Sequence, residues 1–199
     1  MSNLTVVILT KNEEHNIVDA IQSSFQVASK VLVIDSGSTD KTIELAKANE
    51  AYVIGRDLNN DFAGQRNFAD NYVDTEWVLH LDADERINDE LVKAIKVVLD
   101  EDKPVLCKFI RRNHAFGRTF KYGVLAPDTV LRMYPVGKAS WKEKVHERPV
   151  SDLPVVTLKG YLKHYVYISF NQYLNKMNLY STIGAQNNKD KGKKAGVVR

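Results

Sequence analysis

Cysteine is almost absent from this chain, and no long uninterrupted apolar run is present. The single cysteine, Cys107, excludes an internal disulfide and fits a reducing compartment. It lies in the apolar stretch 104–107, which favours a buried structural thiol over a nucleophile. The N-terminal residues carry neither a charged leader nor a long apolar segment, so the sequence predicts no signal peptide and no membrane-spanning helix. We therefore expect a cytoplasmic protein.

An excess of one charge is also missing from most of the chain. The 199 residues include 28 Lys and Arg against 25 Asp and Glu, a net charge of +3. Residues 185–199 alone hold five basic groups and one acidic group, or +4, so the rest is near neutral. Because no basic stripe with interleaved aromatics is present, we expect no nucleic-acid partner. The basic tail predicts a solvated end or, as the alternative, a peripheral contact with anionic lipid at the inner face of the membrane or with a polyanionic acceptor.

The first half of the chain predicts strands that alternate with helices. Apolar, largely β-branched runs predict strands at 4–9, 31–34, 51–54 and 76–81. Apolar residues at helical spacing predict helices at 17–28, 43–46, 62–72 and 91–98, with Asn12 and Asn88 as the N-caps of the first and last. The alternation predicts an α/β fold with a mostly parallel central sheet covered by helices on both faces.

Beyond residue 103 the pattern becomes irregular. Strands are predicted at 105–110 and 129–134, extended chain over 155–167, and a final helix from about 170 to 187. A length of 199 residues suits one domain. We predict a single domain over 1–199, with a regular half at 1–103 and a smaller mixed-β half at 104–199.

Polar clusters follow three of the predicted strands, at 10–13, 35–40 and 82–85. The carboxyl ends of parallel strands share one edge of a sheet, where such folds bind ligands. Asp82 and Asp84 are the most informative members, because residues i and i+2 of an extended chain point to the same side. Carboxylate oxygens suit Mg²⁺ or Mn²⁺. The clusters predict a divalent-metal site, although for this pair taken alone the alternative is a solvated loop.

Four segments carry a resemblance to a known family: 7–14 (VILTKNEE), 33–42 (VIDSGSTDKT), 63–67 (AGQRN) and 81–85 (LDADE). In this order and spacing, the first half of the chain resembles the family-two glycosyltransferases of GT-A fold, which is Rossmann-like. Segment 141–147 (WKEKVHE) resembles the lipopolysaccharide-core β-glucosyltransferase branch of that family. Such enzymes often continue beyond the point where this chain stops.

The resemblance implies transfer of a sugar from a nucleotide diphosphate donor, expected to be a UDP-sugar, to a hydroxyl of a glycan or glycolipid acceptor. It implies inversion at the anomeric carbon. Residues 1–103 would bind the nucleotide sugar, and residues 104–199 would face the acceptor. Asp84 would be the direct ligand of Mg²⁺ or Mn²⁺, and Asp82 a further ligand through water or a contact to the ribose. A divalent ion would stabilise the negative charge that gathers on the leaving diphosphate.

The resemblance also assigns the other donor-site residues. Asp35 would accept hydrogen bonds from the nucleobase, and its alternative is a turn aspartate that caps the next helix. Thr10, Asn12 and Glu13 would line the nucleotide pocket, with a first-turn helix acid as the alternative for Glu13. Arg66 would pair with the diphosphate or with a carboxylate through its planar fork. Its alternative is a surface salt bridge.

An inverting displacement needs a base near the acceptor hydroxyl. The candidates are Glu143, Glu147 and Asp128, and we choose Glu147. The pair His146–Glu147 precedes a proline, which predicts a loop beside a strand, where functional groups concentrate. His146 would position the base or face the acceptor. The alternative for Glu147 is a salt bridge to a neighbouring basic residue.

Three further residues are candidate accessories. Enzymes of GT-A fold often place a later histidine on the metal or diphosphate, and His164 is the candidate here, with a packed histidine as the alternative. Lys176 and Tyr180 are four residues apart on the predicted final helix and share a face. They would reach the diphosphate, or the lysine would instead lie over a core tyrosine.

Two other functions compete with sugar transfer. A nucleotidyltransferase can share this kind of sheet and metal site, but no glycine-rich phosphate loop follows the first predicted strand. A non-catalytic sugar-nucleotide-binding domain would not need both Asp82 and Asp84 together with a base. A receiver domain would need an adjacent acidic pair directly at the end of its first strand, where this chain has Thr10 and Lys11.

Overall fold

The computed structural model describes residues 3–143 and 147–167, together with residues 170, 173, 174, 177, 178 and 181. Its first half contains four parallel strands: β1 (Leu4–Thr10), β2 (Lys30–Asp35), β3 (Tyr52–Gly55) and β4 (Trp77–Asp82). Strand β1 lies between β2 and β4 and is parallel to both, and β3 is parallel to β2. Strands β1, β2 and β4 are buried almost throughout, as their continuous apolar sequences predict.

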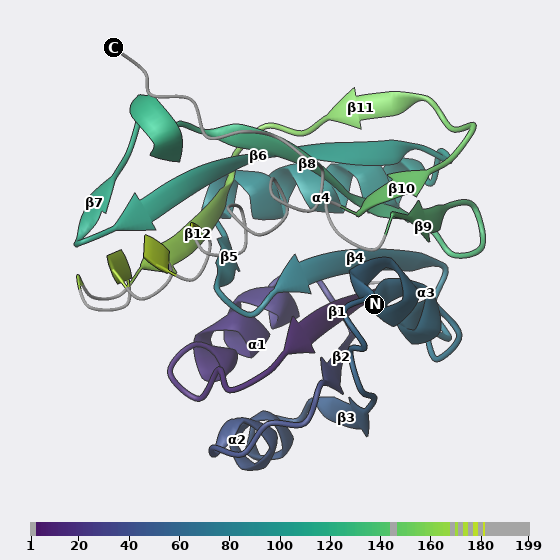
Figure 1. Ribbon diagram of the computed structural model, residues 1–199. Coiled ribbons are helices and arrows are strands. Elements are labelled where there is room, and N and C mark those ends of the chain that lie inside the picture. Colours follow the sequence, from purple (N-terminus) through teal and green to yellow (C-terminus); the bar gives the residue numbers. More distant parts are fainter. Residues whose placement is uncertain are drawn as a thin grey trace, which may run out of the picture.

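Four helices cover the two faces of this sheet (Figure 1): α1 (Ile17–Phe25), α2 (Thr42–Ala48), α3 (Phe62–Asp70) and α4 (Asp89–Glu101). Alternate side chains of β1 point to opposite faces. Ile8 belongs to the core shared with α1, α2 and α4, whereas Val7 belongs to the core shared with α3. The predicted α/β class and the helices on both faces are confirmed.

One predicted helix cap is confirmed and one is wrong. Asn88 caps α4, because its Oδ1 accepts a hydrogen bond of 3.1 Å from the Leu91 N–H. Helix α1 begins at Ile17, and its N-cap position is Asn16. Asn12 lies in the preceding loop with a left-handed φ of 55°. It is therefore a loop residue and caps no helix.

The second half extends the same sheet. Its strands are β6 (Leu106–Ala115), β7 (Arg118–Thr119), β8 (Asp128–Pro135), β11 (Val155–Thr157) and β12 (Leu162–Tyr167), with a 3₁₀ turn η1 (Gly123–Leu125), and β12 pairs with the short strand β5 (Glu85–Ile87) of the first half. The strand order is β3-β2-β1-β4-β8-β6-β12-β5, and β7 and β11 also pair with β6. Strand β8 is antiparallel to both β4 and β6 and thus joins the two halves in one sheet.

The predicted extended segment 155–167 is two strands, β11 and β12, which pair in parallel with successive parts of β6. Gly160 lies between them with a φ of 92°. A Cβ at this position would lie 2.3 Å from the backbone nitrogen of Leu91. The chain bends where only glycine combines a left-handed backbone with so close an approach to α4.

A separate two-stranded sheet, β9 (Ser140–Lys142) paired with β10 (Arg148–Val150), lies over the face that α3 covers. Asn67 of α3 fixes it through a reciprocal pair of hydrogen bonds with the backbone N–H and C=O of Trp141, of 2.8 and 2.9 Å. This hairpin carries Glu147 to the central sheet. Within the described part of the chain, none of the helices has the length and apolarity needed to cross a membrane.

Candidate active site

The predicted polar clusters meet at one edge of the sheet. Strand register places Thr10 beside Asp35 and Leu9 beside Asp82. The loops that follow β1 and β2 are joined by hydrogen bonds, because the Asn12 Oδ1 accepts from the Thr39 N–H at 2.8 Å. The expected convergence of the carboxyl ends of the strands is confirmed.

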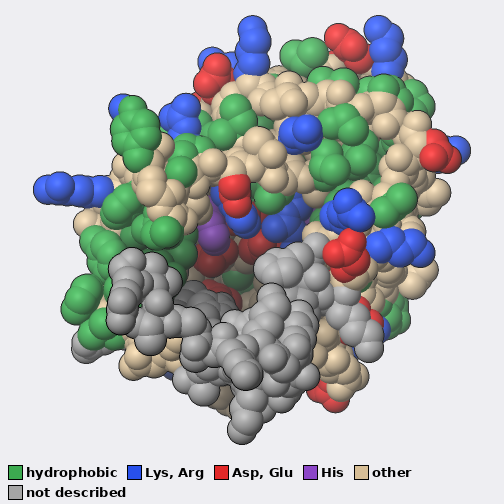
Figure 2. Space-filling view, turned by 45° about the horizontal axis from the view of Figure 1, so that its top comes forward, with side chains coloured by type: hydrophobic (Ala, Val, Ile, Leu, Met, Phe, Trp, Pro, Cys, Tyr) green, Lys and Arg blue, Asp and Glu red, His purple; other side chains and the backbone are tan. Residues whose placement is uncertain are grey.

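A cavity of about 510 Å³ opens at this edge, and we call it the first cavity. Figure 2 shows the hollow as a place where acidic, basic and histidine side chains gather on the surface. Its lining joins the three clusters to β12 and to the segment before α3. The lining residues are Leu9, Thr10, Lys11, Glu13, Ser36, Leu58, Phe62, Asp82, Ala83, Asp84 and His164.

Asp82 and Asp84 do not lie on one extended segment as expected. Strand β4 ends at Asp82, and residues 83 and 84 form a turn that leads into β5. Buried Glu85 closes this turn, because its Oε2 accepts a hydrogen bond of 3.0 Å from the Asp82 N–H. Both carboxylates still line the first cavity, but the turn gives them different partners.

Asp84 faces His164, whose Nε2 lies 3.4 Å from the Asp84 Oδ2. The other ring nitrogen, Nδ1, is hydrogen-bonded to the Oδ1 of Asn113 on β6 at 2.7 Å, which fixes the orientation of the ring. Burial alone would lower the pKa of His164, but the hydrogen bond and negative charge of Asp84 outweigh burial and raise that pKa. Positive charge is therefore stabilised between these two side chains.

This pair fits a divalent cation. The described residues include no cluster of three or more His, Cys, Asp or Glu that could hold a metal ion. One carboxylate and one imidazole would nevertheless suffice where diphosphate oxygens and water complete the coordination, as is usual for Mg²⁺ sites that serve phosphates. The hydrogen bond from Asn113 is the kind of outer contact that orients a metal-binding histidine.

Asp82 is held by two arginines. Its Oδ1 lies 2.7 Å from the Nη2 of Arg66, and its Oδ2 lies 2.7 Å from the Nη2 of Arg132. Burial alone would raise the pKa of Asp82, but the charges of Arg132 and Arg66 outweigh burial and hold that pKa far below its usual range. Both oxygens of this carboxylate therefore neutralise arginines.

Arg66 connects Asp82 to the predicted base. Its Nε and Nη2 donate to the Oε1 of Glu147 at 3.2 and 3.1 Å. The guanidinium stacks over Trp141 at 4.7 Å from the ring centroid, and the residue is only 1% exposed. Arg66 is thus bound to two carboxylates in the interior, and the alternative of a surface salt bridge is wrong.

Glu147 lines a second cavity of about 240 Å³, between the central sheet and the β9–β10 hairpin. The residues that line this second cavity are Lys108, Thr129, Val130, Leu131, Arg132, Trp141, Glu147, Arg148 and Pro149. Asp82 in the first cavity and Arg132 in the second form the ion pair that separates the two.

Comparisons with known proteins identify the family of this chain. The model of the family described as "Glycosyl transferase family 2" matches residues 5–148. The chain belongs to glycosyltransferase family 2. An uncharacterized glycosyltransferase of Rickettsia typhi is 31% identical over 213 residues, covering 100% of this chain and 72% of that protein. The lipopolysaccharide core biosynthesis glycosyltransferase LpsC of Rhizobium meliloti is 28% identical, covering 96% of this chain and 73% of LpsC.

Solved structures agree on the fold of this family-2 glycosyltransferase. Residues 1–349 of S. aureus TarS align with a TM-score of 0.58 at 17% identity, over 83% of this chain and 60% of that chain. The complex of the same TarS segment with UDP-GlcNAc aligns with a TM-score of 0.57 at 19% identity, over 83% of this chain and 58% of that chain. The chain thus spans about 60% of the TarS segment. The predicted GT-A fold and the predicted family are confirmed.

The two other base candidates of the glycosyltransferase are engaged elsewhere. Asp128 accepts hydrogen bonds of 2.9 and 2.6 Å from Arg111. Burial would raise the pKa of Asp128, but the hydrogen bonds and charge of Arg111 lower it. A lowered pKa makes a carboxylate a weaker base. Glu143 is exposed and pairs with Arg148 at 3.1 Å.

The predicted nucleotide-site residues divide into two groups. Thr10 and Glu13 line the first cavity, and the buried Oγ1 of Thr10 has no hydrogen-bond partner among the described residues. Asn12 and Asp35 are outside its lining and organise the loops. The Oδ1 of Asp35 accepts from the N–H groups of residues 37 and 38 at 2.9 and 2.8 Å, and the neighbouring Ser36 faces the cavity.

Three of the predicted accessory residues, His146, Lys176 and Tyr180, lie outside the described residues, as does the basic tail 185–199. His164 is placed at the first cavity.

Sequence reasoning missed Arg132, Asn113 and Trp141, which hold Asp82, His164 and Arg66 respectively. Asn113 and Arg132 lie within the long strands β6 and β8, and no local sequence motif around them indicates a functional residue. Trp141 was part of a family-like segment and could have been selected as a buried partner for an arginine.

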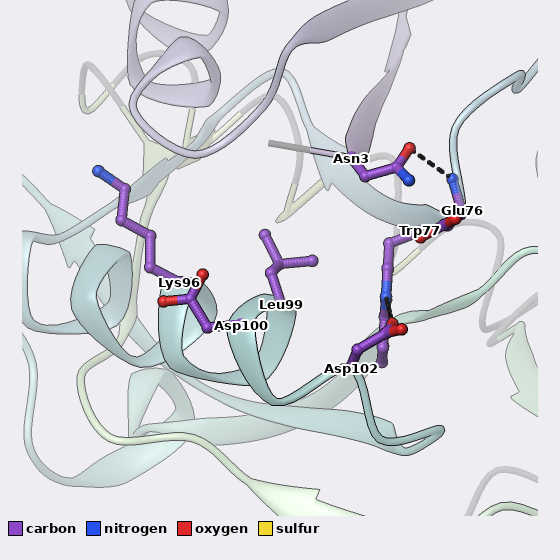
Figure 3. A pocket seen from close by; sticks show the side chains of 7 residues that line it. All are labelled: Asn3, Glu76, Trp77, Lys96, Leu99, Asp100 and Asp102. Atoms are coloured by element: carbon purple, nitrogen blue, oxygen red, sulfur yellow. Dashed lines mark hydrogen bonds between the residues drawn. The ribbon is translucent and has the colours of Figure 1, made fainter. Parts of the chain in front are cut away.

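A third cavity, of about 460 Å³, lies at the opposite edge of the sheet (Figure 3). It is lined by Asn3, Glu76, Trp77, Lys96, Leu99, Asp100 and Asp102, none of which is a predicted site residue. The Oδ1 of Asn3 accepts from the Glu76 N–H at 3.0 Å, which ties the start of β1 to the start of β4. The third cavity thus lies at the amino ends of the strands, whereas folds of this kind bind their ligands at the carboxyl ends.

Proposed function

We propose that this glycosyltransferase moves a sugar from a UDP-sugar to a hydroxyl of a glycan or glycolipid, by a metal-assisted single displacement that inverts the anomeric carbon. One observation carries the proposal: the Asp84–His164 pair lines the first cavity, Glu147 lines the second, and Arg66 pairs with both Asp82 of the first cavity and Glu147 of the second. Family membership supports sugar transfer. The shared fold of TarS, solved with UDP-GlcNAc, supports a UDP-sugar, and LpsC supports a lipopolysaccharide-type acceptor.

In this proposal the first cavity binds the donor. The Thr10 Oγ1, which has no hydrogen-bond partner among the described residues, would hydrogen-bond to the nucleotide. Phe62 would provide an apolar surface for the nucleobase. Asp35 is the proposed nucleobase acceptor. A carboxylate has about four lone-pair sites, so the turn bonds that it accepts leave capacity for one more donor. Glu13 lines the same cavity as a further polar contact.

The Asp84 carboxylate and His164 Nε2 would hold Mg²⁺ or Mn²⁺. A divalent cation bound there supplies positive charge to the leaving diphosphate, which is worth several kcal/mol in the transition state. Asp82 contributes differently from Asp84 in this proposal. Because its oxygens are bound to Arg66 and Arg132, it fixes these two arginines, and any contact with metal would pass through water.

Glu147 would act as the base. Its Oε1 is held by Arg66, and its Oε2 has no hydrogen-bond partner among the described residues. The free Oε2 would take the proton of the acceptor hydroxyl as the new bond from that oxygen to the anomeric carbon forms. The bond from the anomeric carbon to the diphosphate breaks on the opposite face, which inverts the carbon. Such a base contributes roughly 10²- to 10⁴-fold to the rate.

A panel of nucleotide sugars, each with and without Mn²⁺, tests the proposal by thermal unfolding. A donor at 100 times its Kd stabilises the native state by about 2.7 kcal/mol, so the matching UDP-sugar should stand out from the others. The same mixtures with glycan acceptors should release UDP. Release of pyrophosphate would instead indicate nucleotidyl transfer, and binding without any release would indicate a non-catalytic domain.

A further inference from the structure

We propose that the second cavity is the acceptor subsite and that it binds a sugar unit carrying a carboxylate or a phosphate group. This inference rests on the proposed function, because it takes Glu147 as the base. Glu147 lines the second cavity and is absent from the lining of the first. The hydroxyl that Glu147 deprotonates must therefore enter from the side of the second cavity.

The charge of the lining selects an anion. Lys108, Arg132 and Arg148 are the basic residues of the lining and Glu147 is its acidic one, a formal charge of +2 for the lining side chains; Asp82 and Glu143, which pair with Arg132 and Arg148, lie outside the lining. Lys108 of β6 has no ion-pair partner among the described residues, which leaves its charge available. Arg148 pairs with Glu143 but is 69% exposed, so solvent screens that pair and a ligand can compete for the arginine.

Arg132 is the deepest of these three cations. It is only 5% exposed, and one of its nitrogens holds Asp82 at 2.7 Å. Its Nη1 is buried and has no hydrogen-bond partner among the described residues. A buried donor without a partner costs about 1–3 kcal/mol, and an anionic ligand in the adjoining cavity would remove that cost. Planar carboxylate and phosphate groups match a guanidinium in geometry.

The cavity volume limits the ligand. About 240 Å³ is below the roughly 300 Å³ at which pockets for drug-sized ligands begin, so the cavity accommodates one charged sugar unit, and the rest of a longer acceptor would lie outside it. An anion on Arg132 would place that unit beside Glu147. Because Arg132 also holds Asp82, the sugar would lie next to the first cavity, where the donor is proposed to bind.

Nuclear magnetic resonance on protein labelled with ¹⁵N-tryptophan tests this proposal. The chain has two tryptophans, and Trp141 lines the second cavity whereas Trp77 lies at the opposite edge of the sheet. The Trp77→Phe variant assigns the two indole signals. UDP and Mg²⁺ are present throughout to occupy the first cavity, because paramagnetic Mn²⁺ would broaden the Trp141 signal. The probes are D-glucuronate and inorganic phosphate, with D-glucose as the neutral match for the uronate.

We expect both anions to shift the Trp141 signal saturably while the Trp77 signal stays fixed, and D-glucose at equal concentration to shift neither. Calorimetry on the same samples should show that Lys108→Met weakens the affinity for glucuronate about tenfold, the size expected for one charged contact. Lys142→Met is the matched control, because Lys142 is exposed on β9 beside Trp141 and outside the cavity lining. It should change the affinity less than about twofold.

Three results would overturn the inference. These are equal binding of glucose and glucuronate, anion binding that is seen only when UDP and Mg²⁺ are left out, and equal effects of Lys108→Met and Lys142→Met. UDP binding itself is measured in a separate titration without the anions. If UDP binds and the anions do not, the acceptor inference alone fails, whereas loss of UDP binding contradicts the proposed function.

Discussion

The Nη2 of Arg66 lies 2.7 Å from the Oδ1 of Asp82, and the same nitrogen lies 3.1 Å from the Oε1 of Glu147. One buried guanidinium thus joins the first aspartate of the Asp-x-Asp motif to the proposed base. The stack of Arg66 on Trp141 and the bond from Arg132 to Asp82 hold this unit in place. Five side chains from different parts of the chain therefore act as one unit between the two cavities.

Removal of Arg66 should destabilise the fold. Arg66→Met keeps the stack on Trp141 but leaves the Asp82 and Glu147 carboxylates without their shared partner. Loss of one member of a buried ion pair typically costs about 3–5 kcal/mol, and we expect the lower end because Asp82 is 30% exposed. Urea unfolding measures the change. Lys30→Met, which breaks the surface pair with Asp74, should cost much less; equal losses for the two variants would show that the Arg66 network does not stabilise the fold.

Asp84→Ala should abolish metal-dependent UDP binding and turnover without unfolding the protein. The side chain of Asp84 is partly exposed at the first cavity and contacts His164, so its loss removes a metal ligand and leaves the core intact. Calorimetry with UDP, with Mn²⁺ or with a chelator, measures the effect. Asp89→Ala, at the exposed start of α4, is the matched control and should behave as wild type. Wild-type turnover that is unaffected by chelator would exclude the metal role.

Glu147→Gln should leave UDP binding intact and reduce sugar transfer by about 10²-fold or more. Glutamine retains an oxygen that can accept from Arg66, so the network survives while the base is lost. Steady-state turnover and UDP calorimetry separate the two effects. Glu143→Gln, at an exposed residue paired with Arg148, should change turnover less than about twofold. The reverse result would move the base assignment to Glu143.

Buried His80 should make the protein less stable in mild acid. Its Nε2 lies 2.9 Å from the Oδ1 of Asp70 and 3.0 Å from the Tyr134 hydroxyl. Burial lowers the pKa of His80, and the partly opposing charge of Asp70 does not reverse this. Just below pH 6.5, His80 is therefore protonated in the unfolded chain but remains neutral in the native state. Stability is fully present above the unfolded pKa of about 6.5 and is lost as the pH falls below it, by at most about 1.4 kcal/mol per pH unit.

Urea unfolding between pH 8 and pH 5 measures this dependence in wild type and in His80→Gln. The difference between the two proteins is required, because the raised pKa of His164 acts in the opposite direction. His80→Gln should be less stable at pH 8 but should show a flatter decline below about pH 6.5. Parallel curves would mean that His80 does not cause the acid sensitivity.

The local pattern of the sequence predicted the regular half of the fold. The apolar runs that form β1, β2 and β4 and the spacing in α1 and α4 are local signals, and their alternation implies parallel strands whose carboxyl ends meet. The short strands β5, β9 and β10 were not predicted. Three residues give too little periodicity to distinguish a strand from a loop, and partners far away in the sequence decide their pairing.

The sequence by itself determined the family, the α/β architecture, and the edge of the sheet at which Asp82, Asp84 and Thr10 lie. Each of these three features depends on residues that are close together in the chain. Only the tertiary structure decided the partners of those residues. Asp84 meets His164 across 80 positions, and Asp82 meets Arg132 across 50. Such contacts follow from strand order and the turn at residues 83–84, since ion pairs act through space between side chains that folding brings together. The structure therefore separated the two aspartates, placing one beside a histidine at the cavity and the other between two arginines.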